Sequence, residues 1–265
     1  MNHVTPPACV ALALVLLAAI GCGGGGTQTL TVFADASLTG TFGSLGKTFE
    51  AAHPGVAVRF DFGGSGALAQ RIVRGAPTDL FAAAGTAAMR ESGAPSPRVF
   101  ARDSLQIAVP KGNPAHVTNL KDLTAPGVRV ALCAESAPCG AGARTALAAA
   151  GVTVTPVGPD QNGPDQNGPD QNGGERDGAK ALAKVRLGEA DAALVYRTDI
   201  RAAGAADGAL EAVDLAGTSG AVEDYLIATV PGTERLALTR EFVDLVLSNE
   251  GRKVLAAAGF TPVTG

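Results

Sequence analysis

The chain has 265 residues, with 21 lysine and arginine residues against 25 aspartate and glutamate residues, which gives a formal net charge of −4. It contains no strongly basic block, so the composition argues against nucleic acid and anionic lipid headgroups as partners. Any anion site must therefore depend on local hydrogen-bond donors and dipoles rather than on bulk positive charge.

The amino-terminal segment predicts export. Its first 21 residues carry no charged side chain, and Ala8 to Ile20 form an unbroken apolar run of 13 residues. That length fits a signal-peptide core and is too short to span a bilayer. The run leads into Gly21-Cys22 and four further glycines, which resembles a bacterial lipoprotein processing site. We predict a signal peptide over 1–21, lipidation at Cys22 and a flexible tether over 22–28; a simple secretory signal cut nearby is the alternative.

Strands and helices then alternate. The expected strands are 29–34, 56–62 and 79–84. A helix after the first strand has one apolar face, formed by Leu38, Phe42, Leu45 and Phe49. A second helix, with Leu68, Ile72 and Val73, follows the turn Gly63-Gly64-Ser65-Gly66. This rhythm predicts an α/β fold with a parallel sheet.

An apolar run from Leu105 to Val109 begins a second α/β region. Its expected elements are strands over 128–132, 152–157 and 192–195 and helices over 141–150 and 178–187. A strand over 225–230 returns to the first region, and helices over 233–247 and 251–258 follow. We predict two lobes joined by two extended crossings, with lobe 1 over 29–107 and 218–265 and lobe 2 over 108–217.

One segment of lobe 2 is low in complexity. Residues 158–172 repeat Gly-Pro-Asp-Gln-Asn three times in tandem. Proline and glycine in every unit, without apolar positions, cannot bury a face, so we predict a disordered surface insertion. A Ca²⁺- or partner-binding loop is the alternative, because each unit carries one carboxylate.

The cysteines predict a disulfide. Cys9 lies in the leader and Cys22 at the lipid site, which leaves Cys133 and Cys139 in lobe 2. A close pair in an oxidising compartment predicts a bond between them, with two free thiols as the alternative. No further cysteine or histidine lies near them in the sequence, so the spacing of a metal site is not complete.

Residues suited to catalysis are scarce. His53 and His116 are the only histidines beyond the leader, and both lie beside turn signals. The Gly63 to Gly66 turn lacks the lysine and hydroxyl pair of a P-loop, and no metal-ligand spacing occurs. We expect neither an enzyme nor a resident cofactor or metal ion.

Two serines suggest an anion site instead. Ser37 and Ser65 each follow a strand and open a helix, where unpaired amides and a partial positive charge favour an anion. The carboxyl ends of neighbouring parallel strands face one crevice. Ordinary helix capping by both serines is the alternative.

Several blocks, in order along the chain, resemble the periplasmic molybdate-binding proteins of molybdate ABC transporters, members of the type II periplasmic binding protein superfamily. They are Thr31–Thr39, Gly64–Ile72, Gly75–Phe81, Leu105–Pro110, Pro138–Gly140, Gly188–Asp199 and Gly259-Phe260. The resemblance implies an α/β, two-lobed fold, each lobe a mostly parallel sheet flanked by helices, with the ligand in the cleft between them.

The resemblance also implies roles for single residues. Ser37 and Ser65 would give hydroxyls and amides to the oxyanion, and Tyr196 its phenolic hydroxyl. Further backbone amides are implied at Ala84, at Cys139 and at Gly178, the last at the start of a helix.

Asp35 departs from the family pattern. It stands where the family more often has alanine, and a carboxylate aimed at a dianion would repel it. Strand alternation turns either Asp35 or Ala36 toward the crevice, and the sequence leaves this open.

The function implied is that of a monomeric extracytoplasmic solute-binding protein, held to the membrane at Cys22, that captures molybdate or tungstate and delivers it to the permease of an ABC importer. The expected dissociation constant is about 1 µM or tighter. The alternatives are a binder of another small oxyanion such as sulfate, a surface lipoprotein with an interaction role for the repeat, and a hydrolase on the same scaffold.

Overall fold

The computed structural model describes residue 1 and residues 27–133, 138–157, 175–204, 208–215, 217–218 and 221–263. The predicted signal peptide, Cys22 and the repeat over 158–172 lie outside the described residues. Within these ranges, no helix has the length and apolar character needed to cross a membrane.

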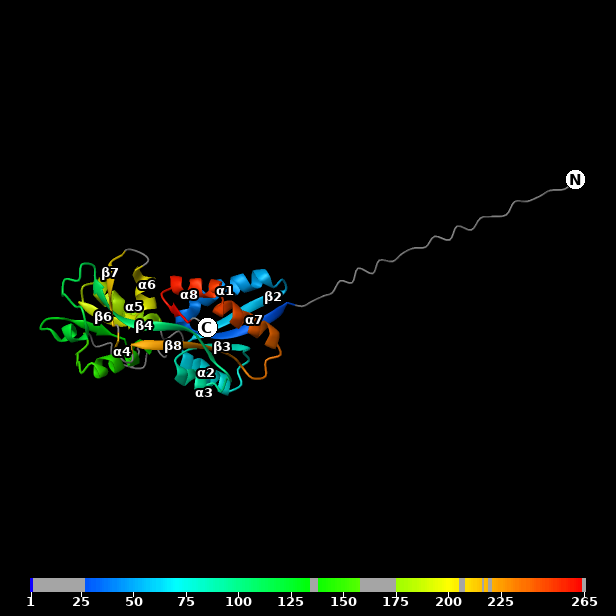
Figure 1. The fold of residues 1–265 in the computed structure, drawn as a ribbon, viewed down its shortest axis with the longest axis horizontal. Coiled ribbons are helices and arrows are strands. Elements are labelled where there is room, and N and C mark those ends of the chain that lie inside the picture. The colour runs from blue at the N-terminus through cyan, green and yellow to red at the C-terminus, as the bar shows by residue number, and fades with distance from the viewer. Residues whose placement is uncertain are drawn as a thin grey trace.

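Lobe 1 is built on three parallel strands, with helices on both faces (Figure 1). The strands, in the order β2-β1-β3, are β1 (Gln28–Asp35), β2 (Val56–Gly63) and β3 (Leu80–Ala84). One face carries α1 (Thr39–Ala52), α7 (Leu236–Leu247) and α8 (Asn249–Ala257). The other carries α2 (Ser65–Val73) and α3 (Thr86–Glu91).

The pleat of β1 explains the two layers of helices. Val32 belongs to the core beneath α1, α7 and α8, whereas its neighbour Phe33 belongs to the core beneath α2 and α3. The apolar face predicted for α1 is confirmed, because Leu38, Phe42, Leu45 and Phe49 are all buried. Val73 is instead 65% exposed, since it lies at the last residue of α2, about a quarter turn from buried Ile72.

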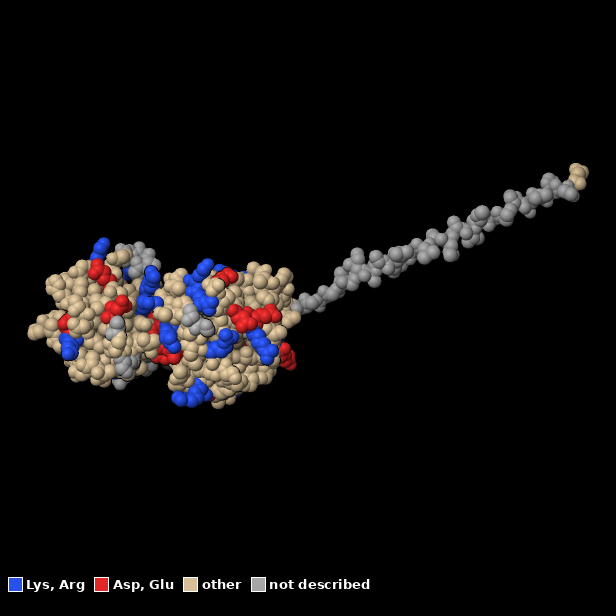
Figure 2. Space-filling model, viewed as in Figure 1, with Lys and Arg blue, Asp and Glu red and all other residues tan. Residues whose placement is uncertain are grey.

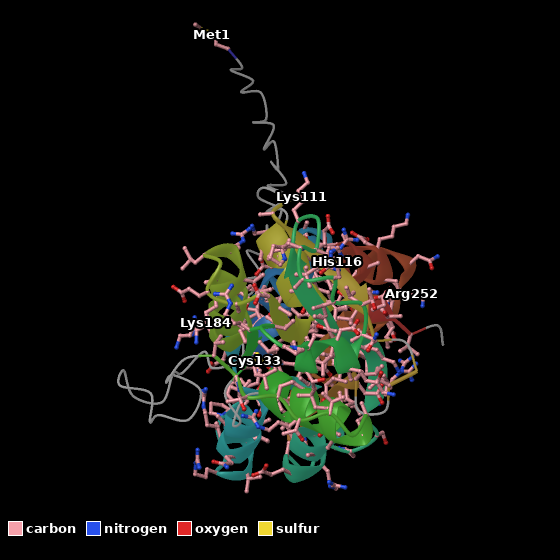
Figure 3. All side chains as sticks on the ribbon, turned by 90° about the vertical axis from the view of Figure 1, so that its left-hand side faces the viewer. Met1, Lys111, His116, Cys133, Lys184 and Arg252 are labelled. Carbon is pink, nitrogen blue, oxygen red and sulfur yellow. A yellow bond between two sulfur atoms is a disulfide. The ribbon has the colours of Figure 1, made fainter. Side chains whose placement is uncertain are left out.

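Lobe 2 has shorter strands. They are β5 (Val130–Leu132), β6 (Ala192–Tyr196) and β7 (Leu210–Asp214). Its helices are the 3₁₀ helix η2 (Leu120–Thr124), α4 (Pro138–Ala149), α5 (Glu175–Arg186) and α6 (Arg197–Gly204). Figure 3 looks onto this lobe from its end, with Cys133 and Lys184 labelled.

Two expectations for lobe 2 are wrong, and two elements were not predicted. The strand predicted over 152–157 is reduced to one bridge between Val130 and Pro156, because proline has no amide hydrogen for a ladder. Helix α5 begins at Glu175, so Gly178 lies within its first turn rather than at its start. Helix α6 and strand β7 were not predicted, because both segments are short and contain few large apolar residues.

Two long strands connect the lobes. The first half of β4 (Arg98–Pro110) pairs with β8 (Val222–Thr229), from Arg98↔Ile227 to Ser104↔Val222. From Leu105 onward, β4 pairs with β6 and β7 instead. The short β9 (Thr261–Pro262) also pairs with β4.

The α/β, two-lobed architecture is confirmed, with the sheet order β2-β1-β3-β8-β4-β6-β5. The expected mostly parallel sheets are mixed. Strand β8 is antiparallel to β3 and β4, and β4 is antiparallel to β6 and β7, because both strands pass between the lobes. In lobe 2, only β5 and β6 pair in parallel among the named strands.

Candidate functional site

Ser37 and Ser65 lie at the same edge of the lobe 1 sheet. Ser37 belongs to the 3₁₀ helix η1 (Ala36–Leu38), directly after β1, and Ser65 is the first residue of α2, which follows β2 after the single residue Gly64. Strands β1 and β2 run in parallel with Asp35 opposite Gly63, so both serines emerge at one end of the sheet.

The Asp35 carboxylate lies between these serines. Its Oδ1 accepts hydrogen bonds from the Ser37 amide at 3.1 Å and the Ser37 hydroxyl at 2.7 Å. Its Oδ2 accepts from the Ser65 hydroxyl at 2.5 Å. Asp35 is only 5% exposed. The orientation that the sequence left open is therefore settled: Asp35 faces the predicted donors.

Ala84 and Tyr225 complete this cluster. The Ala84 amide donates to the Ser65 hydroxyl oxygen at 2.9 Å. The Tyr225 hydroxyl lies 2.9 Å from the Ser37 hydroxyl. Burial raises the pKa of Tyr225, and the negative charge of Asp35 raises it further, so the phenol is neutral at physiological pH. Tyr225 was not predicted from the sequence; the available signal was a tyrosine in the apolar strand β8, where it lies opposite Ala84.

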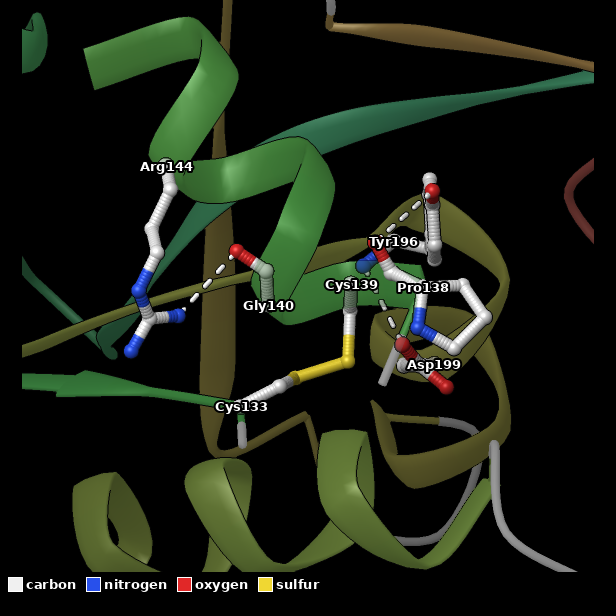
Figure 4. The surroundings of a disulfide bond; sticks show 7 residues. All are labelled: Cys133, Pro138, Cys139, Gly140, Arg144, Tyr196 and Asp199. Atoms are coloured by element: carbon white, nitrogen blue, oxygen red, sulfur yellow. Dashed lines mark hydrogen bonds between the residues drawn. A yellow bond between two sulfur atoms is a disulfide. The ribbon is translucent and has the colours of Figure 1, made fainter. Parts of the chain in front are cut away.

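The residues predicted in lobe 2 form a second group (Figure 4). Cys133 and Cys139 form a disulfide with a Cα–Cα distance of 5.8 Å, at the start of α4. The Tyr196 hydroxyl donates to the Pro138 carbonyl at 3.5 Å, which brings the end of β6 against the same turn.

Asp199 connects the other members of the lobe 2 group. It accepts from the Tyr196 amide at 3.1 Å. A Cβ added at Gly178 would lie 2.5 Å from the Asp199 carboxylate, so a larger residue there requires movement. Figure 4 shows Asp199 beside Cys139 as well. The structure thus gathers Cys139, Gly178 and Tyr196 around Asp199 and the start of α4 at Pro138.

The two groups are near enough for the charge of Asp35 in lobe 1 to act on Tyr196 in lobe 2. Burial raises the pKa of Tyr196, and the negative charges of Glu223, Asp103, Asp199 and Asp35 raise it further, so its hydroxyl is a neutral donor. A cavity of about 610 Å³ lies between the lobes. Ser37 of η1 and Thr41 of α1 line it from lobe 1, and Ala179 and Asp199 line it from lobe 2. Ser65, Ala84, Cys139 and Tyr196 do not line this cavity.

Clustered positive charge does not characterise the surroundings of the site. In the face shown in Figure 2, basic and acidic side chains are interspersed. The groups identified around the site are neutral donors and carboxylates. Among the described residues, no cluster of histidine, cysteine, aspartate or glutamate could hold a metal ion.

Asp103 provides a test of the crossing between the lobes. It is fully buried and accepts hydrogen bonds from the Thr198 hydroxyl at 2.6 Å and the Ser104 amide at 2.8 Å. Burial raises the pKa of its carboxyl, whereas these hydrogen bonds and Arg197 lower it. The net result is a rise of this pKa from 3.8 to about 6. The folded state therefore holds this proton more tightly than the unfolded state does.

Asp103 is expected to contribute stability below about pH 4 that is lost as the pH rises through about 6, in total about 3 kcal/mol. Urea unfolding at intervals between pH 4 and 7 measures this fall. Asp103→Asn should flatten it, because asparagine does not titrate. Identical pH profiles for the two proteins would contradict the assignment.

The disulfide gives a second test. Replacing Cys133 and Cys139 together by serine should lower the free energy of unfolding by about 2 kcal/mol, because the bond closes only a short loop. Urea unfolding of the oxidised protein and the variant measures the difference. Treating both with dithiothreitol supplies the control: it should destabilise the wild-type protein alone, and an equal effect on the variant would argue against this bond as the cause.

Comparison with known proteins places this architecture in a family. The family model described as bacterial extracellular solute-binding protein matches residues 30–261. The molybdate-binding protein ModA of Mycobacterium bovis is 35% identical over 240 residues, covering 89% of this chain and 85% of the relative. The chain therefore belongs to the bacterial extracellular solute-binding protein family.

Solved structures share the fold. The substrate binding domain of a putative molybdenum ABC transporter from Clostridium difficile superposes with a TM-score of 0.69 at 22% identity, covering 89% of this chain and 99% of that one. The sulfate-binding protein SubI of Mycobacterium tuberculosis gives a TM-score of 0.67 at 17% identity, covering 89% and 87%.

Proposed function

We propose that this solute-binding protein captures molybdate or tungstate outside the cytoplasm and delivers it to the permease of an ABC importer. One observation carries the proposal: the Ser37 amide and the hydroxyls of Ser37 and Ser65 converge on a single anionic group, at 2.5 to 3.1 Å. The 35% identity to a molybdate-binding protein supports the choice of anion.

The proposed ligand contacts come from both lobes. Lobe 1 offers the Ser37 amide and the two serine hydroxyls. Lobe 2 offers the amides of Cys139 and Gly178 and, once it turns from the Pro138 carbonyl, the hydroxyl of Tyr196. The Ala84 amide already donates to the Ser65 oxygen, which leaves the Ser65 proton to point at the anion. We therefore assign Ala84 the role of orienting Ser65.

Neutral donors can contribute much of the free energy that holding a dianion requires. Each hydrogen bond to a charged group contributes roughly 1.5–3 kcal/mol, so six such bonds can offset much of the desolvation cost. Since the donors are divided between the lobes, the anion stabilises the closed arrangement over the open one. We propose that the permease recognises this closed form and that a lipid at Cys22 keeps the protein near it.

Sulfate is the second candidate ligand, because the fold also matches a sulfate-binding protein. Isothermal titration of the leaderless protein with molybdate, tungstate, sulfate and phosphate separates the two. A site shaped for the larger oxyanions should bind molybdate and tungstate with a dissociation constant of about 1 µM or tighter. Sulfate that bound as tightly as molybdate would refute selection by size.

A further inference from the structure

Asp35 occupies the donors that the proposed function assigns to the ligand. Its two carboxylate oxygens take the hydroxyl protons of Ser37 and Ser65 and the amide proton of Ser37. A serine hydroxyl has one proton and an amide has one, so each can serve one acceptor fully at a time. An external oxyanion cannot receive these hydrogen bonds while Asp35 holds them.

The surrounding groups orient the hydroxyl protons of Ser37 and Ser65 toward Asp35. Since Ser37 gives its own proton to Asp35, the hydroxyl of Tyr225 is the donor in its contact with Ser37. The amide of Ala84 donates to Ser65 in the same way. Each serine therefore accepts one hydrogen bond, from Tyr225 or Ala84, and donates its own proton to the Asp35 carboxylate. The same arrangement would direct both protons at a bound anion.

The charges nearby make sharing unfavourable. Burial raises the pKa of Glu223, and the negative charges of Asp224 and Asp35 raise it further, so carboxylates already influence one another here. Adding a dianion beside an ionised Asp35 brings like charges together at a partly buried site, where water screens them weakly. Movement of the Asp35 side chain away from the serines relieves this repulsion.

We infer that Asp35 is a tethered competitor for the anion site: its carboxylate fills the site in the ligand-free protein and must leave before the oxyanion binds, which makes Asp35 a determinant of affinity. The inference rests on the proposed function for the identity of the ligand, but the occupation of the donors by Asp35 is independent of it. The competing possibility is that Asp35 stays and accepts a proton carried by the anion; removing Asp35 would then weaken binding.

Titration with sodium molybdate distinguishes these cases. Asp35→Ala should bind molybdate at least about tenfold more tightly than the wild-type protein, because hydrogen bonds to a charged group no longer have to be broken first. Glu223→Gln is the comparison, since it removes a nearby negative charge without freeing the serine donors; its gain in affinity should be clearly smaller than that of Asp35→Ala, because only repulsion is relieved. Unchanged or weaker binding by Asp35→Ala, or an equal gain in Glu223→Gln, overturns the inference.

Sodium formate tests the same point without molybdate. A small carboxylate can replace the one removed, so formate should raise the melting temperature of Asp35→Ala and leave that of the wild-type protein unchanged. This result, without molybdate binding in any variant, would uphold the role of Asp35 and refute the proposed function. Molybdate binding of equal strength in all variants, without a formate effect, would do the reverse.

Asp35→Asn guards against a folding defect in the alanine variant. Asparagine keeps the length of the side chain and one carbonyl acceptor but lacks the charge. It should bind molybdate more tightly than the wild-type protein does and less tightly than Asp35→Ala. Weaker binding than wild type by correctly folded Asp35→Asn, as judged by circular dichroism, counts against displacement.

Discussion

Replacing Ser37 and Ser65 together by alanine is expected to weaken molybdate binding by about 10²- to 10⁴-fold. Each serine offers a hydroxyl to the same anionic group, and each hydrogen bond to a charge contributes roughly 1.5–3 kcal/mol. Isothermal titration measures the loss. Ser44→Ala, on the exposed side of α1, is the matched control and should bind as the wild-type protein does.

The size of this loss should depend on Asp35. In the wild-type background the two substitutions also release Asp35 from its partners, so weaker competition offsets part of the lost binding. In the Asp35→Ala background nothing offsets it, and the loss should approach the upper end of the range. A double variant that retains wild-type affinity in both backgrounds would show that the serines only cap their helices.

Among the substitutions proposed for this protein, Phe42→Ala is expected to lower the free energy of unfolding most, by about 3–5 kcal/mol. Phe42 is fully buried, and its ring centroid lies 5.7 Å from that of Phe100, 5.9 Å from that of Phe242 and 6.3 Å from that of Phe60. Alanine would leave a cavity where α1, α7 and the sheet meet.

Urea unfolding followed by circular dichroism, without added oxyanion, measures the effect of Phe42→Ala. Phe62→Ala is the comparison, because Phe62 is only partly buried and stacks on Phe60 at one side of this core. It should cost less than Phe42→Ala does. Equal losses in the two variants would mean that the aromatic core tolerates rearrangement around Phe42.

The sequence predicted the positions of the two serines in the fold better than their hydrogen-bond partners. The apolar spacing of α1 and the ends of β1 and β2 placed Ser37 and Ser65 correctly at one edge of the sheet, because local periodicity decides such features. The pairing of β8 with β3 is a contact between distant segments, so Tyr225 could not be assigned to Ser37 from its own surroundings in the sequence.

Asp35 shows a second limit of the sequence. Alternation along a strand gives two possible directions at its last residue, and the start of η1 breaks the alternation there. Only the hydrogen bonds decide between them. The position of the Asp199 carboxylate is likewise set by α6, a short helix that was not predicted from the sequence. Gly178 leaves room for this carboxylate because it has no side chain.

The paired strands between the lobes limit how the molecule can open. Strands β4 and β8 pair from Arg98↔Ile227 to Ser104↔Val222, with one register shift between Val99 and Ala101. A slip of one residue over the regular part of this pairing would turn its side chains to the wrong face. Such a ribbon resists sliding but can flex out of its plane through small torsional changes along its length. The two lobes can therefore rotate apart about this ribbon and close again with the same donors of lobe 1 opposite the same donors of lobe 2.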